Sequence, residues 1–157
     1  MPDMLVKLYE LPDAEAYYKK VRDIGIDVRR AIAPEKHIVV NWVRENFGEA
    51  WASECDVAFS NQPVSCYIAV EEGKLIGFAC YNATCKGFFG PTGVSLEARG
   101  KGIGKALLLK CLYAMEAEGY GYAIIGSVGP VDFYAGAVGA TVIEGSTPGV
   151  YRGLLKR

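Results

Sequence analysis

A short run of glycines and basic residues at positions 99–105 (RGKGIGK) has the composition of an anion-binding loop. It follows a segment of strand character and precedes the most regular helical pattern in the chain, at 102–118. The first N–H groups of a helix have no partners within the helix, and the helix dipole adds partial positive charge there. Glycines let the backbone approach phosphate oxygens closely, and neighbouring Arg and Lys side chains add charge. The segment therefore predicts a site for a pyrophosphate.

Two common phosphate loops do not fit this spacing. A P-loop requires G-x-x-x-x-G-K-[ST], but Lys105 is followed by Ala106, and no glycine lies five residues before Gly104. The dinucleotide fingerprint G-x-G-x-x-G would need a glycine at the position of Lys105. On these residues alone, a glycine-rich turn that only caps a helix remains the alternative.

Hydrophobic periodicity predicts a mixed α/β chain around the loop. The expected strands are 4–8, 26–32, 65–70, 75–81, 88–96, 121–126 and 140–144, and the expected helices are 13–24, 34–47, 49–59, 102–118 and 130–138. The fold class is therefore α/β, with helices packed on a central, largely antiparallel sheet. Gly90, Pro91 and Gly93 interrupt the strand at 88–96, which indicates a bulge or the close approach of another group to its backbone.

Two finer expectations concern element faces and ends. In the helix at 34–47, Ile38, Trp42 and Val43 are expected to face the core. The last strand is expected to extend, after a turn at 148–149, towards Tyr151.

The composition limits the classes of protein to which the chain can belong. The chain has 157 residues, 51% of them hydrophobic, which suits one domain, 1–157, with a substantial core. A formal net charge of −1 argues against a broad basic surface for nucleic acid. No run of about 18 apolar residues predicts a membrane span, and the N-terminus lacks the pattern of a signal peptide, so a cytoplasmic location is expected.

The cysteines and the single histidine bear on metal and nucleophile chemistry. The five cysteines include no CxxC pair, and His37 is the only histidine, so a Cys/His zinc site is not expected and we predict no metal. Reduced cysteines acting as small apolar residues are the simpler interpretation. His37 at the start of a helix also leaves no Ser-His-Asp or Cys-His arrangement unless it serves as the base itself.

The loop resembles motif A of the GNAT N-acetyltransferases, [RQ]-x-x-G-x-[GA], with Arg99, Gly102 and Gly104 at its specified positions. Phe133-Tyr134 followed by Gly139-Ala140 resembles a second segment of that family. The resemblance covers roughly 28–151, and residues 1–25 extend beyond the usual start, as an added strand–helix unit or part of a homodimer contact. Many members carry an asparagine where this chain has residues 127–129 (SVG).

The resemblance implies a fold whose middle strands splay apart and acetyl-CoA as cosubstrate. The loop would hold the pyrophosphate, the strand ending at 94–96 would pair with the pantetheine arm, and Tyr134 would be the general acid. The implied cofactor-binding residues are Val94, Leu96, Arg99, Gly100, Lys101, Gly102, Ile103, Gly104 and Lys105.

The activity implied is transfer of the acetyl group to a primary amine of a small molecule or peptide by direct attack. A lysine-like amine has a pKa of ~10.4, so deprotonating it at neutral pH costs roughly 4–5 kcal/mol and calls for a base or a water chain. The candidate bases are Glu45, Glu49, Glu54, Asp56 and Glu97, and the candidate acceptor-pocket aromatics are Trp42, Trp51, Phe88, Phe89 and Tyr151. The alternatives are a non-catalytic acyl-CoA binding or sensing module and a nucleotide-phosphate binder of another family.

Overall fold

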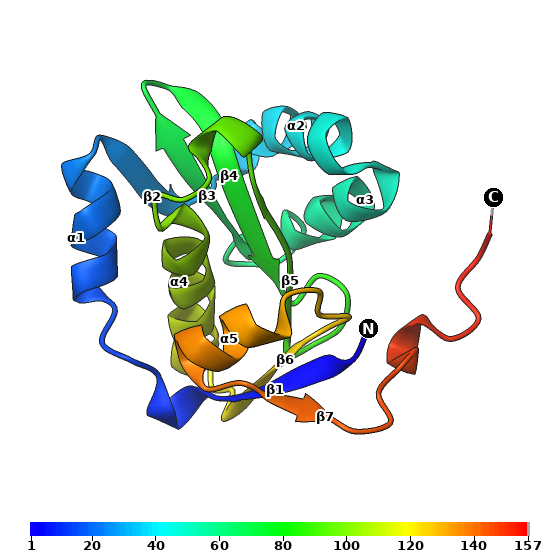
Figure 1. Ribbon diagram of the computed structural model, residues 1–157. Coiled ribbons are helices and arrows are strands. Elements are labelled where there is room, and N and C mark those ends of the chain that lie inside the picture. Colours follow the sequence, from blue (N-terminus) through cyan, green and yellow to red (C-terminus); the bar gives the residue numbers. More distant parts are fainter. Residues whose placement is uncertain (157) are drawn as a thin grey trace.

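A seven-stranded sheet runs through the molecule in the order β2-β3-β4-β5-β6-β1-β7 (Figure 1). The structure, a computed structural model, describes residues 1–156. The strands are β1 Asp3–Lys7, β2 Ile26–Arg30, β3 Cys66–Glu71, β4 Lys74–Tyr81, β5 Phe88–Val94, β6 Tyr122–Ile125 and β7 Thr141–Ile143. All neighbours are antiparallel except β5 and β6, which are parallel. The predicted α/β fold class, with a mixed and mostly antiparallel sheet, is confirmed.

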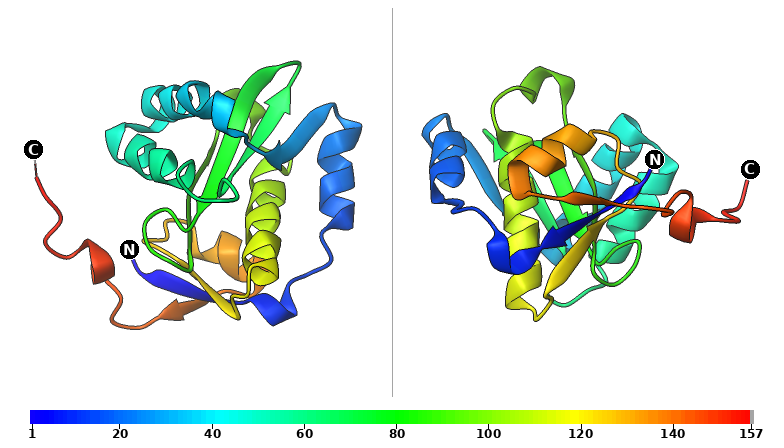
Figure 2. Two further views of the ribbon diagram at one scale, coloured as in Figure 1. Left: turned by 180° about the vertical axis from the view of Figure 1, so that it is seen from behind. Right: turned by 60° about the horizontal axis from the view of Figure 1, so that its bottom comes forward.

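Helices cover both faces of the sheet (Figure 2). The helices are α1 Glu15–Asp23, α2 Lys36–Phe47, α3 Glu49–Ala58, α4 Ile103–Ala117 and α5 Val131–Val138. One core contains buried residues of α1, α4 and α5, and the other contains those of α2 and α3. Strand alternation divides the sheet between them: Phe78 and Cys80 face the α2/α3 core, while Ala79 and Tyr81 face the α4 core. No helix within residues 1–156 is long and apolar enough to cross a membrane.

The N-terminal segment is built into the sheet. Strand β1 lies between β6 and β7, with Met4 opposite both Ile125 and Val142. Asp3 is buried and accepts a hydrogen bond from the N–H of Ser127 at 2.8 Å. Residues 1–25 form a strand and a helix, and the start of the strand is hydrogen-bonded to Ser127 and Val128.

Helix α2 corrects one expectation. Its buried residues are Val39, Val40 and Val43, and Trp42 packs against the same core, but Ile38 is 56% exposed. The helix follows a 3-10 turn at Ala33–Glu35, and Glu35 is held by the guanidinium of Arg29. Of the three residues predicted to face the core, Ile38 alone is therefore wrong.

The C-terminal segment differs from the expectation that the last strand extends towards Tyr151. Strand β7 ends at Ile143, and Gly149–Tyr151 forms a 3-10 turn instead of extending the sheet. Gly145, with φ of 74°, turns the chain, and the hydroxyl of Ser146 accepts a hydrogen bond from the N–H of Asp3. Strand β1 therefore pairs with β6, and β7 pairs with the other edge of β1. The segment after β7 runs away from the sheet (Figure 1).

Candidate functional site

The parallel pair β5–β6 opens after two residues. Phe88 lies opposite Ile124 and Phe89 opposite Ile125; beyond them Gly90 and Pro91 form the irregular part of β5, and residues 92–94 pair with β4 alone. Pro91 cannot donate a hydrogen bond, Gly90 has a φ of 120°, and the register with β4 shifts between Ala79 and Tyr81. The bulge predicted from these residues is thus present. The pairing of β5 with β6 ends at Phe89 and Ile125, here called the vertex, and the unpaired side of β5 beyond it is here called the opening.

The glycine-rich loop lies where β5 leads into α4. Gly100 and Gly102 have φ values of 83° and 84°, a left-handed conformation that favours glycine, and Gly102 caps the helix. The N–H groups at the first turn of α4 therefore point out of the helix end. A Cβ atom at Gly104 would meet no atom closer than 4.0 Å, so a ligand can approach this backbone. The Nε of Arg99 donates to the carbonyl of Val94 at 3.3 Å, which ties the loop to the end of β5.

Helix α1 contributes a cation to this loop that sequence reasoning missed. The Nζ atom of Lys20 lies 3.5 Å from the place that a Cβ of Gly102 would occupy. Lys105, by contrast, has its Nζ atom 3.9 Å from the ring centre of Tyr17, also on α1. No local pattern could have identified Lys20, because it is about eighty positions from the loop in the sequence.

The other residues predicted to bind the cofactor differ in exposure and in the atoms that a ligand could contact. Val94 is the last residue of β5, but Leu96 lies beyond it in the 3-10 turn Leu96–Ala98 and is 75% exposed. The side chain of Ile103 is buried in the core, so only its backbone N–H can face a ligand. Lys101 is partly exposed within the loop. The strand predicted at 88–96 is therefore shorter by two residues.

Tyr134 lies beside the vertex on the α4 side of the sheet. Its ring packs edge-to-face against Phe89, with ring centres 6.4 Å apart, and against Phe133. Burial raises the pKa of Tyr134 to about 12. Its hydroxyl therefore stays protonated at neutral pH, as a hydrogen-bond donor must.

A second group of polar side chains lies at the vertex on the α2/α3 side. A Cβ at Gly126, the residue after the last pair of β6, would lie 2.9 Å from the hydroxyl of Tyr151 and 3.0 Å from the ring of Phe88. Thr84 donates a hydrogen bond to the carboxylate of Glu54. Burial, and then the charge of the Glu54 carboxylate, raise the pKa of Tyr151. Tyr151 thus brings a hydroxyl to the vertex, and the Glu54 carboxylate of α3 lies near enough to raise its pKa.

The surroundings of Glu54 distinguish it from the other candidate bases. Glu49 pairs with Arg44, and Asp56 pairs with Lys36. Glu45 and Glu97 are exposed. Glu54 is half-buried, and no ion pair within residues 1–156 involves it. It is therefore the candidate best placed to receive a proton near the vertex.

The candidate acceptor aromatics separate into two groups. Phe89 is buried in the α4 core, and Trp42 packs against Phe47 and Phe78. Trp51, Phe88 and Tyr151 retain exposed surface, with Trp51 at 36%. Phe47 covers Gly93 of β5 so closely that a Cβ there would lie 2.4 Å from its ring, which explains why glycine is needed at that position.

Comparison with known proteins decides the family. The profile of the acetyltransferase (GNAT) family matches residues 36–135, more than half of the chain. The chain belongs to the GNAT acetyltransferase family. The fold, with its opened β5–β6 pair and glycine loop before α4, agrees with this membership.

Solved structures share the fold at low sequence identity. A GCN5-related glucosamine N-acetyltransferase region of a fungal multi-domain GH3 β-N-acetylglucosaminidase aligns with 90% of this GNAT chain at a TM-score of 0.74 and 17% identity. A GCN5-related N-acetyltransferase from Sphaerobacter thermophilus covers 90% at 0.67 and 23%, and a GNAT acetyltransferase from Colwellia psychrerythraea covers 90% at 0.62 and 17%. The chain spans 19%, 48% and 52% of these structures. No curated protein matches the sequence.

Proposed function

We propose that this GNAT protein transfers the acetyl group of acetyl-CoA to a primary amine by direct attack. The observation that carries the proposal is the opening between β5 and β6, which has the glycine loop at one end and ionisable side chains on both sides of its vertex. Acetyl-CoA supplies an acetyl thioester, which is the reactive group when it is bound. The rest of the chemistry depends on side chains of this chain.

The loop and β5 fit the two parts of coenzyme A. The N–H groups at the start of α4 bind the pyrophosphate, and Arg99, Lys101 and Lys20 add positive charge beside it. The backbone of residues 90–94, unpaired on the side of β6, pairs with the amide groups of the pantetheine arm. This arrangement directs the thioester to the vertex.

Glu54 makes the acceptor amine reactive. An ammonium group placed at the vertex meets the hydroxyl of Tyr151 and, beyond it, Thr84 and the carboxylate of Glu54. Glu54 accepts the proton that the amine must lose, and this offsets part of the roughly 4–5 kcal/mol that deprotonation costs at neutral pH.

Tyr134 assists departure of the thiolate from the opposite side of the sheet. With its pKa at about 12 and that of a thiol near ~8.5, full proton transfer is uphill by about 5 kcal/mol. Tyr134 therefore acts mainly as a positioned hydrogen-bond donor, which stabilises the negative charge as it develops on sulfur.

The acceptor is proposed to be a small molecule or a peptide with a free amine. One structure of the same fold, an aminoglycoside acetyltransferase from an uncultured soil metagenome, was determined with sisomicin bound; it covers 73% of this chain at a TM-score of 0.54 and 14% identity. The carboxylate and the half-exposed Trp51 suit a cationic amine, because both attract positive charge.

A turnover screen tests this proposal. Release of the free thiol from acetyl-CoA would be followed over a library of amino sugars, small amines, amino acids and peptides, together with a thermal melt with and without acetyl-CoA. We expect at least one amine to be acetylated, and a stabilisation of about 2.7 kcal/mol at 100 times the dissociation constant. Stabilisation without turnover on any amine would favour the non-catalytic acyl-CoA binding module instead. Absence of both would contradict the cofactor assignment.

A further inference from the structure

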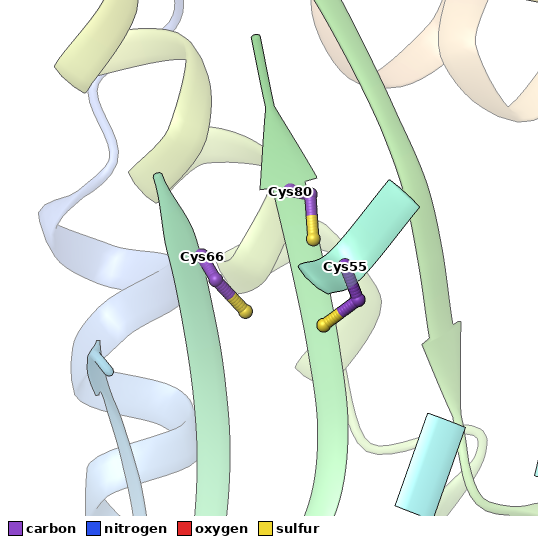
Figure 3. A group of neighbouring side chains, drawn as sticks. All are labelled: Cys55, Cys66 and Cys80. Carbon is purple, nitrogen blue, oxygen red and sulfur yellow. The ribbon is translucent and has the colours of Figure 1, made fainter. Parts of the chain in front are cut away.

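Three thiols converge in the core on the α2/α3 side of the sheet. Cys55 comes from α3, Cys66 from β3 and Cys80 from β4, and their sulfur atoms all lie within 4.8 Å of one another. Cys66 and Cys80 are direct partners across the antiparallel pair, and Cys55 lies on the helix above them (Figure 3). Their separation in the sequence, without any CxxC pair, hid this grouping.

The surroundings of these thiols, here called the thiol triad, are apolar. All three residues are 0% exposed, and the core around them consists of aliphatic and aromatic side chains such as Val43, Ala52 and Phe78. The only buried polar or charged residues in the described chain are Asp3, on the distant strand β1, and Ser65. The triad therefore has no buried cation to balance thiolate charge.

We propose that the thiol triad is a binding site for a thiophilic trivalent ion, of which As(III) is the representative. Three thiolates carry a charge of −3, so a trivalent ion yields a neutral complex. A divalent ion would leave one net negative charge in this core, and a monovalent ion would leave two. Since a net charge in an apolar interior is strongly unfavourable, charge balance selects the trivalent ion.

The chemistry balances without an oxidant. Arsenous acid, As(OH)3, is neutral in water, and each of the three thiols replaces one hydroxyl. Three arsenic–sulfur bonds form, three arsenic–oxygen bonds break, and the three thiol protons leave within three waters, so neither arsenic nor sulfur changes its oxidation state. The neighbouring thiols of Cys66 and then Cys80 lower the pKa of Cys55, whereas the pKa values of Cys66 and Cys80 are raised, so Cys55 is the thiol that gives up its proton most readily.

The geometry is close to what such an ion needs. With bonds to sulfur of about 2.3 Å and the bond angles of roughly 100° that the lone pair of As(III) imposes, three ligands place their sulfurs about 3.5 Å apart. The triad sulfurs already lie within 4.8 Å, so small side-chain rotations complete the site. The remaining cysteines are elsewhere: Cys111 faces the α4 core, where its thiol contacts the carbonyl of Ala79, and Cys85 is partly exposed in the segment before β5.

The test uses the full chain, reduced and then incubated with sodium arsenite. Native mass spectrometry would count the arsenic retained after desalting, and X-ray absorption at the arsenic edge would count its sulfur neighbours. We expect one arsenic per chain, with three sulfur ligands. Wild-type protein that stays folded and retains no arsenic, or retains it with fewer than three sulfurs, would overturn the proposal.

Variants locate the site. Cys66→Ala and Cys80→Ala should each bind arsenite at least about tenfold more weakly, because only two thiols remain. The matched controls Cys111→Ala, equally buried, and Cys85→Ala should bind as the wild type does. Equal losses in Cys111→Ala and Cys66→Ala would contradict the assignment, and so would zinc retention stronger than arsenic retention. If a triad variant unfolds, the X-ray absorption of the wild type still decides.

Discussion

The two ends of the β5–β6 opening are built in different ways. The glycine loop comes from one run of residues, 99–105, that leads directly into α4. The vertex is assembled from α3, the segment before β5, α5 and the chain end, which contribute Glu54, Thr84, Tyr134 and Tyr151. Binding a phosphate needs backbone N–H groups, which neighbouring residues supply, whereas acid–base chemistry needs side chains from several directions.

The largest loss of activity is expected for Glu54→Gln, at the vertex. The amide keeps a partner for Thr84 but cannot accept the amine's proton, so kcat/KM should fall by about 10²–10³-fold at neutral pH. The deficit should shrink as the pH approaches ~10.4, where a lysine-like amine is already neutral. Steady-state rates across pH would measure this.

The matched control for Glu54 is Glu49→Gln, on the same helix but paired with Arg44 at the surface. It should retain nearly full activity. Equal losses in both variants would mean that Glu54 acts through the stability of α3 and not as the base.

Tyr134→Phe should have the second largest effect, about a 10²-fold loss in single-turnover rate. The ring contact with Phe89 remains, so acetyl-CoA affinity should change little. Because its pKa is raised to about 12, Tyr134 remains protonated through pH 10, and the wild-type rate should show no fall from its ionisation below that pH. Tyr122→Phe, at an exposed position, is the control. A Tyr134→Phe variant that keeps the full single-turnover rate would leave Tyr134 as a packing residue.

At the loop, Gly104→Val should weaken acetyl-CoA binding about 10-fold or more. Gly104 has no positive φ, so the backbone accepts a side chain, but the new methyl groups would occupy the space through which a phosphate approaches the N–H groups. Calorimetric titration and a denaturant melt on the same variant would separate affinity from stability. Gly102→Val is a poorer test, since the φ of 84° there strains any other residue. Unchanged affinity in Gly104→Val would place the phosphate elsewhere.

The smallest effect is expected from Lys20→Met, which removes the cation that α1 brings to the loop. Because an exposed charge contributes ~0–1 kcal/mol, acetyl-CoA affinity should fall by up to about fivefold, and less at high salt. Lys19→Met, whose ammonium is paired with Asp23 at 2.6 Å, should leave affinity unchanged. Similar losses in both variants would indicate a general charge effect of α1.

The bounds of the elements could be predicted closely from the sequence. The face that each element buries and the distant segments that it contacts could not. The helix expected at 102–118 is found at Ile103–Ala117, because its apolar spacing and flanking glycines are local signals. In α2, Val43 and Trp42 were predicted correctly but Ile38 was not, since Ile38 and Val39 are both apolar and only the contact with the sheet chooses between them. The five candidate bases predicted from the sequence included Glu54. Only the packing of the folded chain shows that Glu54 is half-buried and accepts a hydrogen bond from Thr84.

The sequence by itself determined the α/β order, the glycine loop before α4 and the family, because each depends on residues that are neighbours in the chain. The tertiary structure alone decided that β1 enters the sheet beside β6, that Lys20 reaches the loop, and that the hydroxyl of Tyr151 lies against Gly126. It also decided that Cys55, Cys66 and Cys80 meet in one core. Such contacts join segments tens of residues apart, and local preferences carry no information about which distant segments the buried surface brings together.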